Sequence, residues 1–466
     1  MVAALSLSAS YLAANTNKTF LSGRPLGQNL AMETVGFNEL LASNTFDSFG
    51  ADLQTTYFYS RSTNPEALGK YFGFNDKNEF TAYTSTSADI NLGGIIYDHG
   101  SSRSTTEFIK LEPTQTVYGT RLQYQQNLDS IFEGLWFRVK LPIVKVSNDM
   151  HMSTRGANSA ISTDISNYFK GELQALNAND TSGEARTPLA NALINGKRTA
   201  SNFADVSANL GYTAIDNDRY TVDVNIGLTL PTGTKTTGMY AWEPVTGNNG
   251  HYELGAGVSS VVKLWSNDKG TVNFNTALDY RYGFKATEKR TFGLNGANWG
   301  QYQLATNVAV GANNQTIVTT PAANFLTLKA YVTPGSMLDG LAGITYNRGD
   351  MALDLGYNFF YKEKSSVTLR DAITDGTWRQ LTNLALNLHT SANLASGNVT
   401  EIPQSRINTL SGSAAATSHT LYANASYMFS KMHYPMMIGA GVHYEFTGTN
   451  SAVENWGINA KTGFSF

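Results

Sequence analysis

The sequence has no cysteine and few charged side chains. Without cysteine the chain forms no disulfide bonds, thiolate metal sites or thiol nucleophiles. Charged residues are 15% of its 466 residues, against about 25% in an average soluble domain. The net charge of −3 argues against a nucleic-acid-binding surface. No stretch approaches the roughly 20 apolar residues of a transmembrane helix.

Tyrosine, phenylalanine and glycine are abundant, with 24, 23 and 42 residues. From Phe49 onward, apolar and polar residues alternate in runs of about ten residues or more, the length of a membrane-crossing strand. The clearest run is Tyr220–Leu230, in which every even position is apolar or aromatic and every odd position is polar or small. Successive side chains of a strand point to opposite faces, so each run predicts a strand with one apolar and one polar face.

The same alternation recurs along the chain, and we interpret it as about twelve strands. A long run, Leu326–Tyr346, is interrupted at Pro334 and Gly335; it would form one bulged strand or two, which leaves fourteen strands as the alternative. The other runs are Phe49–Tyr59, Val117–Tyr124, Leu135–Ile143, Ala204–Tyr212, Tyr252–Leu264, Val272–Phe284, Met351–Tyr361, Leu421–Phe429, Met436–Phe446 and Trp456–Phe466.

The connections alternate between short turns and long loops. The short turns are Ile215–Asp218, Ser266–Gly270, Asn347–Asp350 and Ser430–His433; the long loops are Ser60–Pro113, Val146–Phe203, Pro231–His251, Lys285–Phe325, Lys362–His419 and Thr447–Val453. This layout is typical of all-β, antiparallel, up-and-down transmembrane barrels with long extracellular loops and both termini on the periplasmic side. A soluble β-sandwich is the alternative, but its strands average only about 5–6 residues.

The last strand ends in phenylalanine, and Phe466 and Phe464 share one face with the apolar residues before them. This strand resembles the C-terminal strand of Gram-negative outer-membrane proteins, and the run Asp223–Gly233, which ends in Leu-Pro-Thr-Gly, resembles a strand end common in porin-like barrels. The resemblance implies a bacterial outer-membrane protein whose partners are the barrel-assembly machinery, with Phe466 and Phe464 as the assembly signal, and outer-membrane lipid or lipopolysaccharide. It also implies a homo-oligomer such as a trimer.

The chain before the first strand divides into two parts. Residues 1–14 are small and apolar and resemble a remnant of a secretory signal peptide without its basic start, although they would equally belong to the mature protein. Residues 15–47 form a periplasmic or lumenal segment, and residues 48–466 form the barrel.

The polar face of the predicted strands carries charges of both signs. A charge on the lipid side at mid-membrane costs about 2–4 kcal/mol, so we expect these side chains to line the lumen. The predicted lumen-lining charges are Arg121, Arg138, Lys140, Asp205, Asp223, Glu253, Lys263, Asp279, Arg281, Lys329, Asp354 and Lys461.

A charged lumen predicts a porin that passes small polar solutes and ions by diffusion. The alternative is a structural or surface protein whose barrel is plugged, by residues 15–47 or by the loop Val146–Phe203, and whose loops make contacts. A barrel for hydrophobic substrates would also carry an N-terminal plug, but it would have an apolar lumen beside it. We find no catalytic set, metal ligands or cofactor motif, so an enzyme is not expected.

Overall fold

The computed structural model describes most of the chain after the N-terminus. No helix within these residues is long and apolar enough to span a membrane. The described residues are 18–33, 50–83, 89–92, 107–156, 159–173, 185–308, 317–381, 399–412, 414–450 and 453–466.

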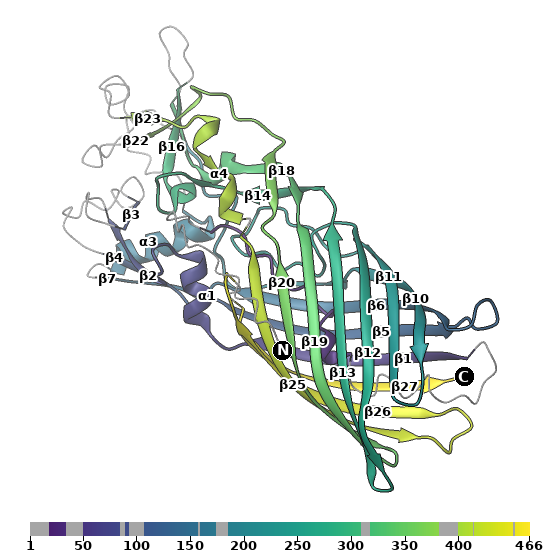
Figure 1. Cartoon of the computed structure of the whole chain (residues 1–466). Helices are drawn as coiled ribbons and strands as arrows, with labels where there is room; N and C mark the ends of the chain where they lie inside the picture. Colours follow the sequence, from purple (N-terminus) through teal and green to yellow (C-terminus); the bar gives the residue numbers. More distant parts are fainter. Residues whose placement is uncertain are drawn as a thin grey trace, which may run out of the picture.

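Twelve antiparallel strands form a closed barrel, because the pairing of β6 with β10 joins the two edges of the sheet (Figure 1). Each strand pairs with its neighbour along the chain, and the order confirms the predicted up-and-down barrel. The strands are β1 (Ala51–Ser62), β5 (Thr114–Asn127), β6 (Leu135–Asp149), β10 (Val206–Asp216), β11 (Tyr220–Leu230), β12 (Glu253–Asn267), β13 (Gly270–Gly283), β19 (Gly335–Arg348), β20 (Met351–Lys362), β25 (Ala416–Phe429), β26 (Met436–Thr447) and β27 (Asn455–Ser465).

All short turns lie at one end of the barrel. The first strand begins and the last strand ends at the same end. The backbone N–H of Ala51 donates to the carbonyl of Phe466 at 2.8 Å, and the N–H of Phe466 donates back to Ala51 at 2.9 Å. These bonds pair the start of β1 with the end of β27. An even number of antiparallel strands requires this arrangement.

The long run Leu326–Tyr346 is two strands, of which only one belongs to the barrel. Pro334 has no N–H to donate to a ladder, and Gly335 has a φ of +77°, a conformation that favours glycine. The chain therefore leaves the barrel sheet before β19, and β18 (Thr327–Thr333) pairs instead with β14 (Ala286–Thr291) and β21 (Ser366–Leu369). Twelve strands is correct, and fourteen is wrong.

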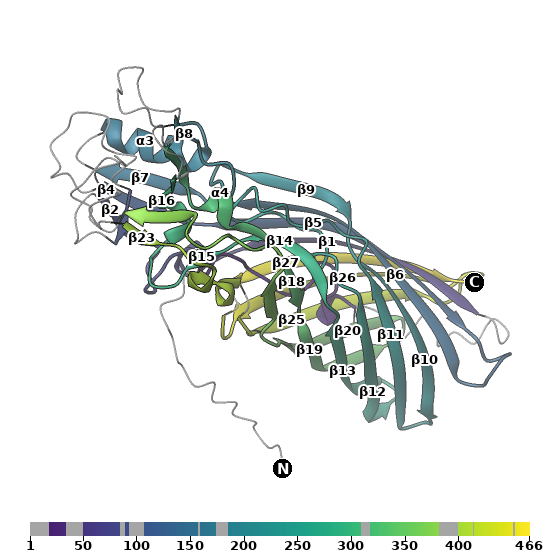
Figure 2. The same cartoon turned by 90° about the horizontal axis from the view of Figure 1, so that it is seen from above.

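The long loops form a cap at the opposite end of the barrel (Figures 1 and 2). Its largest core brings together Phe80, Ile109, Phe169 and Trp299. The helix of the loop Val146–Phe203, α3, packs in this core rather than in the lumen. The cap contains α1 (Pro65–Phe72), β2 (Glu79–Tyr83), β3 (Ile90–Asn91), β4 (Glu107–Leu111), β7 (Met152–Gly156), α3 (Ser159–Lys170), β8 (Ala185–Arg186), β15 (Gly293–Leu294), η3 (Gly300–Tyr302), β16 (Leu304–Val308), β17 (Ile317–Pro321), α4 (Ala323–Leu326), β22 (Trp378–Leu381), β23 (Val399–Glu401), η4 (Gln404–Arg406), β24 (Ile407–Asn408) and η5 (Thr409–Gly412), beside β14, β18 and β21. A further strand, β9 (Arg198–Phe203), extends the barrel wall along β6.

The outer face of the barrel is apolar, as the alternation predicts. On β11, Ile226 is 61% exposed, and Val224 and Leu228 beside it are also exposed, whereas Asn225 and Asp223 point inward. Exposed tyrosines lie toward the strand ends, among them Tyr252 and Tyr282. An exposed apolar band with aromatic side chains at its edges is the surface of a barrel that spans a membrane.

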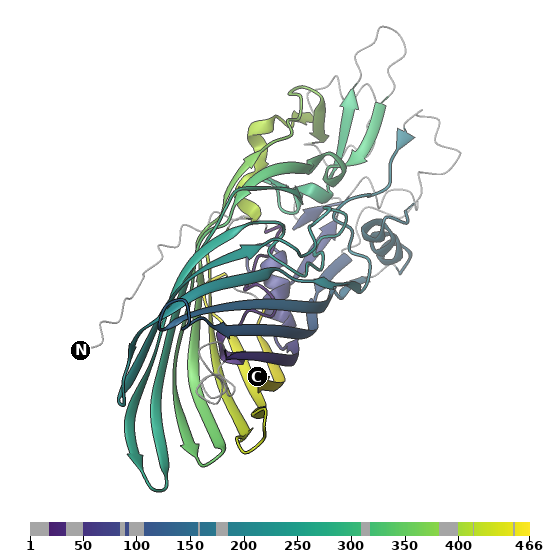
Figure 3. The ribbon, with the colours of Figure 1, turned by 90° about the vertical axis from the view of Figure 1, so that its right-hand side faces the viewer.

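Residues 18–33, called here the lumenal segment, run from the cap into the barrel, whose side view is shown in Figure 3. The carbonyl of Phe20 accepts the hydroxyl of Tyr71 on α1, and Leu21 packs on the cap core, whereas the residues after them contact the inner face of the wall. The segment's one regular element is the short 3-10 turn η1 (Leu30–Met32), which packs against β19, β20 and β25. Leu30 and Ala31 contact Leu341 and Tyr422 of the wall. The structure thus places this part of the predicted segment 15–47 in the lumen; the rest of that segment and residues 1–14 lie outside the described residues.

Candidate functional site

The inner face of the barrel is polar, and most of the predicted charges lie on it. The exceptions are Asp205, Lys263 and Lys329. The predicted charges on the inward face of barrel strands are Arg121, Arg138, Lys140, Asp223, Glu253, Asp279, Arg281, Asp354 and Lys461.

Lys329 does not line the lumen. It is exposed on β18, in the separate sheet of the cap, because the break at Pro334 takes β18 out of the barrel. Asp205 precedes β10 at the cap end, where its carboxylate accepts the backbone N–H of Gly233 at 3.0 Å and so holds the loop after β11. Lys263 is exposed next to a bulge near the short-turn end of β12.

Glu33 of the lumenal segment contacts three cations of the wall, two through its buried carboxylate and one through its backbone carbonyl; we call these residues the Glu33 cluster. The Oε2 of Glu33 lies 2.7 Å from Nζ of Lys140, and its Oε1 lies 3.3 Å from Nη1 of Arg121. Nζ of Lys461 donates to the backbone carbonyl of Glu33 at 3.1 Å. The three cations come from β5, β6 and β27, so the cluster ties the segment to three strands.

A second cluster has the opposite arrangement of charges, and we call it the Arg24 cluster. Nη1 of Arg24 lies 3.1 Å from Oδ2 of Asp339, and Nε lies 3.6 Å from Oε2 of Glu445. The guanidinium also lies over the ring of Phe360, 4.8 Å from its centroid. Here the segment supplies the cation, and the wall supplies two carboxylates.

Further hydrogen bonds to neutral groups of the segment accompany the two clusters. Nη1 of Arg121 donates to the carbonyl of Gly27 at 3.1 Å, and Nδ2 of Asn424 donates to the carbonyl of Ala31 at 3.3 Å. Arg281 donates to the side chain of Gln28, and Lys362 donates to the hydroxyl of Ser22. The segment therefore bonds to wall groups from Ser22 to Glu33.

These ion pairs offset the free-energy cost of burying charges of the wall. Moving a single charge out of water costs several kcal/mol unless a partner compensates it, and Glu33, Arg121 and Lys461 are all buried. Removal of the segment would leave the cations of the Glu33 cluster without their carboxylate, and water would have to replace it. The lumen is thus polar but occupied, unlike the open lumen of the porin prediction.

The strand pattern did not reveal either residue of the segment, Glu33 or Arg24, because neither lies on a strand. It also missed Asp339, whose inward neighbours on β19 are Met337 and Leu341. Polarity therefore does not mark the inward face of that strand. The lumenal position considered for residues 15–47 named no residue of the segment as a partner of the wall charges. The only signal was a carboxylate and a guanidinium outside the strands.

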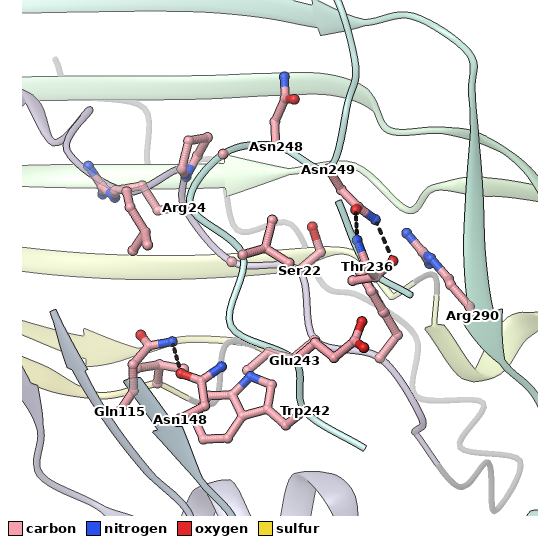
Figure 4. Close-up of a pocket in the computed structure, with 18 of the residues that line it drawn as sticks. Ser22, Arg24, Gln115, Asn148, Thr236, Trp242, Glu243, Asn248, Asn249 and Arg290 are labelled. Carbon is pink, nitrogen blue, oxygen red and sulfur yellow. Dashed lines mark hydrogen bonds between the residues drawn. The ribbon is translucent and has the colours of Figure 1, made fainter. Parts of the chain in front are cut away.

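A cavity of about 250 Å³ lies between the lumenal segment, the barrel mouth and the cap (Figure 4). One wall is aromatic: Phe72, Trp242, Trp299 and Tyr302 line it. Two of these rings are fixed through their polar atoms, since Nε1 of Trp299 donates to the carbonyl of Phe72 at 2.9 Å and the hydroxyl of Tyr302 donates to the carbonyl of Ala192 at 2.9 Å.

A buried ionic group on β14 borders the same cavity. Oε2 of Glu288 accepts Nε of Arg290 at 2.7 Å, and its Oε1 lies 2.7 Å from Nε2 of His251. Burial by itself would raise the pKa of Glu288, but the charge of Arg290 and the hydrogen bonds from His251 and Arg290 outweigh it and lower the pKa to about 2. Glu288 is therefore a carboxylate at neutral pH.

No protein-family model matches the sequence, and no curated protein matches it. Among solved structures, an outer-membrane channel from Pseudomonas putida F1 has 13% identity and a TM-score of 0.38, covering 90% of this chain and 96% of the channel. The deltaS2 mutant of the TodX monoaromatic hydrocarbon channel has 9% identity and a TM-score of 0.36, covering 97% and 96%. A FadL homologue from Pseudomonas aeruginosa has 10% identity and a TM-score of 0.31, covering 92% and 93%. Similarities this low carry no argument about function.

Proposed function

We propose that this protein is a channel of the bacterial outer membrane whose lumen is closed by the lumenal segment and opens when that segment leaves its clusters. The observation that carries the proposal is the attachment of residues 18–33 to the wall by the Glu33 and Arg24 clusters. Transport through it is passive diffusion of small solutes and involves no chemical step.

The outer-membrane location rests on the two faces of the wall. In lipid, every backbone polar group must be paired within the protein, and a closed barrel achieves this. The exposed apolar band fits hydrocarbon, and Phe464 and Phe466 point outward with 39% and 43% exposure at the end of β27. The resemblance of that strand to outer-membrane proteins supports the same location.

A channel accounts better for the lumen than a purely structural barrel does. The wall carries polar groups that bond to one another: Asp223 accepts the hydroxyl of Thr213 at 2.7 Å, and Nδ2 of Asn209 donates to Oδ1 of Asn225 at 3.0 Å. A permanently filled lumen needs no such groups, because a buried polar group that is not fully hydrogen-bonded costs free energy and an apolar side chain does not. An aqueous path that can be closed requires a wall lined with polar groups and a separate segment that can cover them.

The second candidate is a surface protein with a permanently plugged barrel. The size of the cap, with its own sheets and cores, favours it, because exposed loops of this kind are suited to contacts with other molecules. The two candidates differ in one property: only a channel conducts after the segment is released.

The test is single-channel conductance of the refolded protein in a planar bilayer. The wild type is compared with the double variant Glu33→Gln/Arg24→Met, which removes the ion pairs of both clusters, and with the control Glu133→Gln/Arg219→Met, which changes exposed residues of two short turns. We expect brief, rare openings for the wild type and the control, and long openings for the double variant. Steady wild-type conductance would refute closure by the segment, and a silent double variant would favour the plugged surface protein.

A further inference from the structure

The cavity at the barrel mouth has an uneven distribution of charge that its own residues do not balance. Its aromatic lining is formed by Phe72, Trp242 and Trp299. Figure 4 shows Trp242 on the same cavity as Ser22 and Arg24 of the lumenal segment. At about 250 Å³, it lies just below the roughly 300–1,000 Å³ of sites for drug-sized molecules. The size therefore suits a small solute.

The carboxylates that line the cavity are already engaged. Glu288 is bonded to Arg290, to His251 and to the side-chain amide of Asn249. Glu253 accepts Nδ2 of Asn248 at 2.9 Å and lies 3.3 Å from Nη1 of Arg281. The two remaining lining carboxylates are equally occupied: Glu445 lies beside Arg24, and Glu243 caps the backbone N–H groups of Thr237, Gly238 and Met239.

His251 and Arg290 hold Glu288 from two sides. Nδ1 of His251 lies 2.7 Å from the carbonyl oxygen of Phe284, and its Nε2 lies 2.7 Å from Oε1 of Glu288. Nε of Arg290 donates to Oε2 of Glu288 at 2.7 Å. Both carboxylate oxygens of Glu288 are therefore occupied, and neither contacts a further cation of the cavity.

Lys362 adds a further cation at the same place. It is 5% exposed at the end of β20, and its ammonium donates to the hydroxyl of Ser22. Within the part of the chain that the structure describes, no carboxylate forms an ion pair with it. Glu288 and Glu253 act on this ammonium only from a distance, and a buried charge without a contacting partner is costly. The ammonium has three N–H donors, so it can donate to an anion in addition to Ser22.

We propose that this cavity binds a small amphipathic carboxylate, with its anionic group at Lys362 and its apolar body against Trp242, Trp299 and Phe72. The inference rests on the channel function proposed above and names the solute class that the channel admits. The same contact links binding to opening, because a carboxylate at Lys362 competes with Ser22, which belongs to the lumenal segment. Binding would therefore weaken the attachment of the lumenal segment to the wall at Ser22.

The test uses the intrinsic fluorescence of Trp242 and Trp299 in the full chain, held in a non-ionic detergent. Benzoate, benzyl alcohol and benzylamine serve as probes of similar size that carry a negative, a zero and a positive charge. One charge-assisted hydrogen bond is worth about 1.5–3 kcal/mol, so we expect benzoate to bind at least about tenfold more tightly than benzyl alcohol. Benzylamine should bind most weakly.

Two substitutions locate the charge. Lys362→Met should bring benzoate down to the affinity of benzyl alcohol, whereas Lys362→Arg should keep the preference. Lys329→Met, an exposed lysine of β18, is the matched control and should bind like the wild type. Heat-modifiable gel mobility confirms that each variant is folded, and Trp242→Phe confirms the origin of the signal.

Equal affinity for the three probes, or a benzoate preference that survives Lys362→Met, would overturn the inference. Its failure is distinct from failure of the proposed function, because binding is measured without conduction. Conductance of the Glu33→Gln/Arg24→Met variant without any benzoate preference would overturn the solute class alone. Benzoate binding together with a silent variant would refute the channel and reduce the site to a surface receptor.

Discussion

The outer and inner faces of the barrel are made by the same strands, but their side chains meet different surroundings. On the outer face, Leu355 and Ile226 are 68% and 61% exposed, and a fluid hydrocarbon accepts any apolar side chain in their place. On the inner face, Arg121 and Asp339 each need a partner at one position, and residues of a separate segment provide it. The outer face thus needs only to be apolar enough for lipid, whereas the inner face is complementary to one particular sequence, the lumenal segment.

The largest effect should come from a charge on the outer face. Ile226→Arg places a cation near the middle of the apolar band, and we expect it to lower the free energy of unfolding in lipid vesicles by about 2–4 kcal/mol. Tyr220→Arg, at the short-turn end of the same strand, should cost only about 0–1 kcal/mol. Denaturant titrations in vesicles measure both. Equal costs would mean that Ile226 does not lie at mid-membrane.

The inner face should respond next, through the Glu33 cluster. Glu33→Gln replaces the carboxylate that faces Arg121 and Lys140 with a neutral amide, and a hydrogen bond to a charged group is worth about 1.5–3 kcal/mol. The lost free energy weakens docking of the segment to the wall and leaves the stability of the barrel unchanged. Chymotrypsin, which cuts after residues such as Phe20 and Leu26, should therefore cleave the segment much faster. Unchanged cleavage, equal to that of Glu133→Gln, would contradict the role of the cluster.

The Arg24 cluster should give a smaller effect. After Arg24→Met, Asp339 keeps a hydrogen bond from Asn358, and Glu445 keeps one from Thr420 at 3.3 Å. We expect a docking loss of about 1–3 kcal/mol, the cost of an incompletely satisfied buried group. A double-mutant cycle with Asp339→Asn measures the pair itself. Additive effects would show that the two side chains do not interact.

The smallest effect should be the pH dependence of the stability of the cap. The pKa of Glu288 is about 2 in the fold, below its ordinary value of 4.5. A carboxyl with a lowered pKa stabilises the fold above its ordinary value, and this contribution is lost as pH falls from about 4.5 toward 2. Thermal unfolding of the cap, followed by tryptophan fluorescence, should weaken across that window. Glu288→Gln should be less stable at neutral pH and lose this pH dependence.

The sequence predicts the outer face well because lipid imposes one rule on every strand. The alternation in Tyr220–Leu230 gives β11 residue for residue, and each predicted run overlaps a barrel strand. The rule fails where the chain leaves the membrane. In the sequence, Lys329 continues the alternation of β19. In the structure it belongs to the cap, because Pro334 and Gly335 redirect the chain.

The sequence predicts the inner face only in part, since alternation shows which side chains point inward but not what they meet. It places Arg121, Lys140 and Lys461 inward but gives no sign that the first two share one carboxylate and that the third bonds to the backbone of the same residue. That partner, Glu33, is distant in the chain and lies in a segment without periodicity. Only the three-dimensional structure brings the two together.

The most direct test of the central claim is a reversible crosslink between the lumenal segment and the wall. A Cβ on Gly27 would lie 3.2 Å from the Cβ of Pro142 on β6, close to the roughly 3.5–4.5 Å of a disulfide, and the chain has no other cysteine. Conductance is recorded for Gly27→Cys/Pro142→Cys in the Glu33→Gln/Arg24→Met background, before and after oxidation. We predict long openings in the reduced protein, silence after oxidation, and recovery on reduction. Openings that persist in protein shown by mass spectrometry to be crosslinked would contradict closure by this segment.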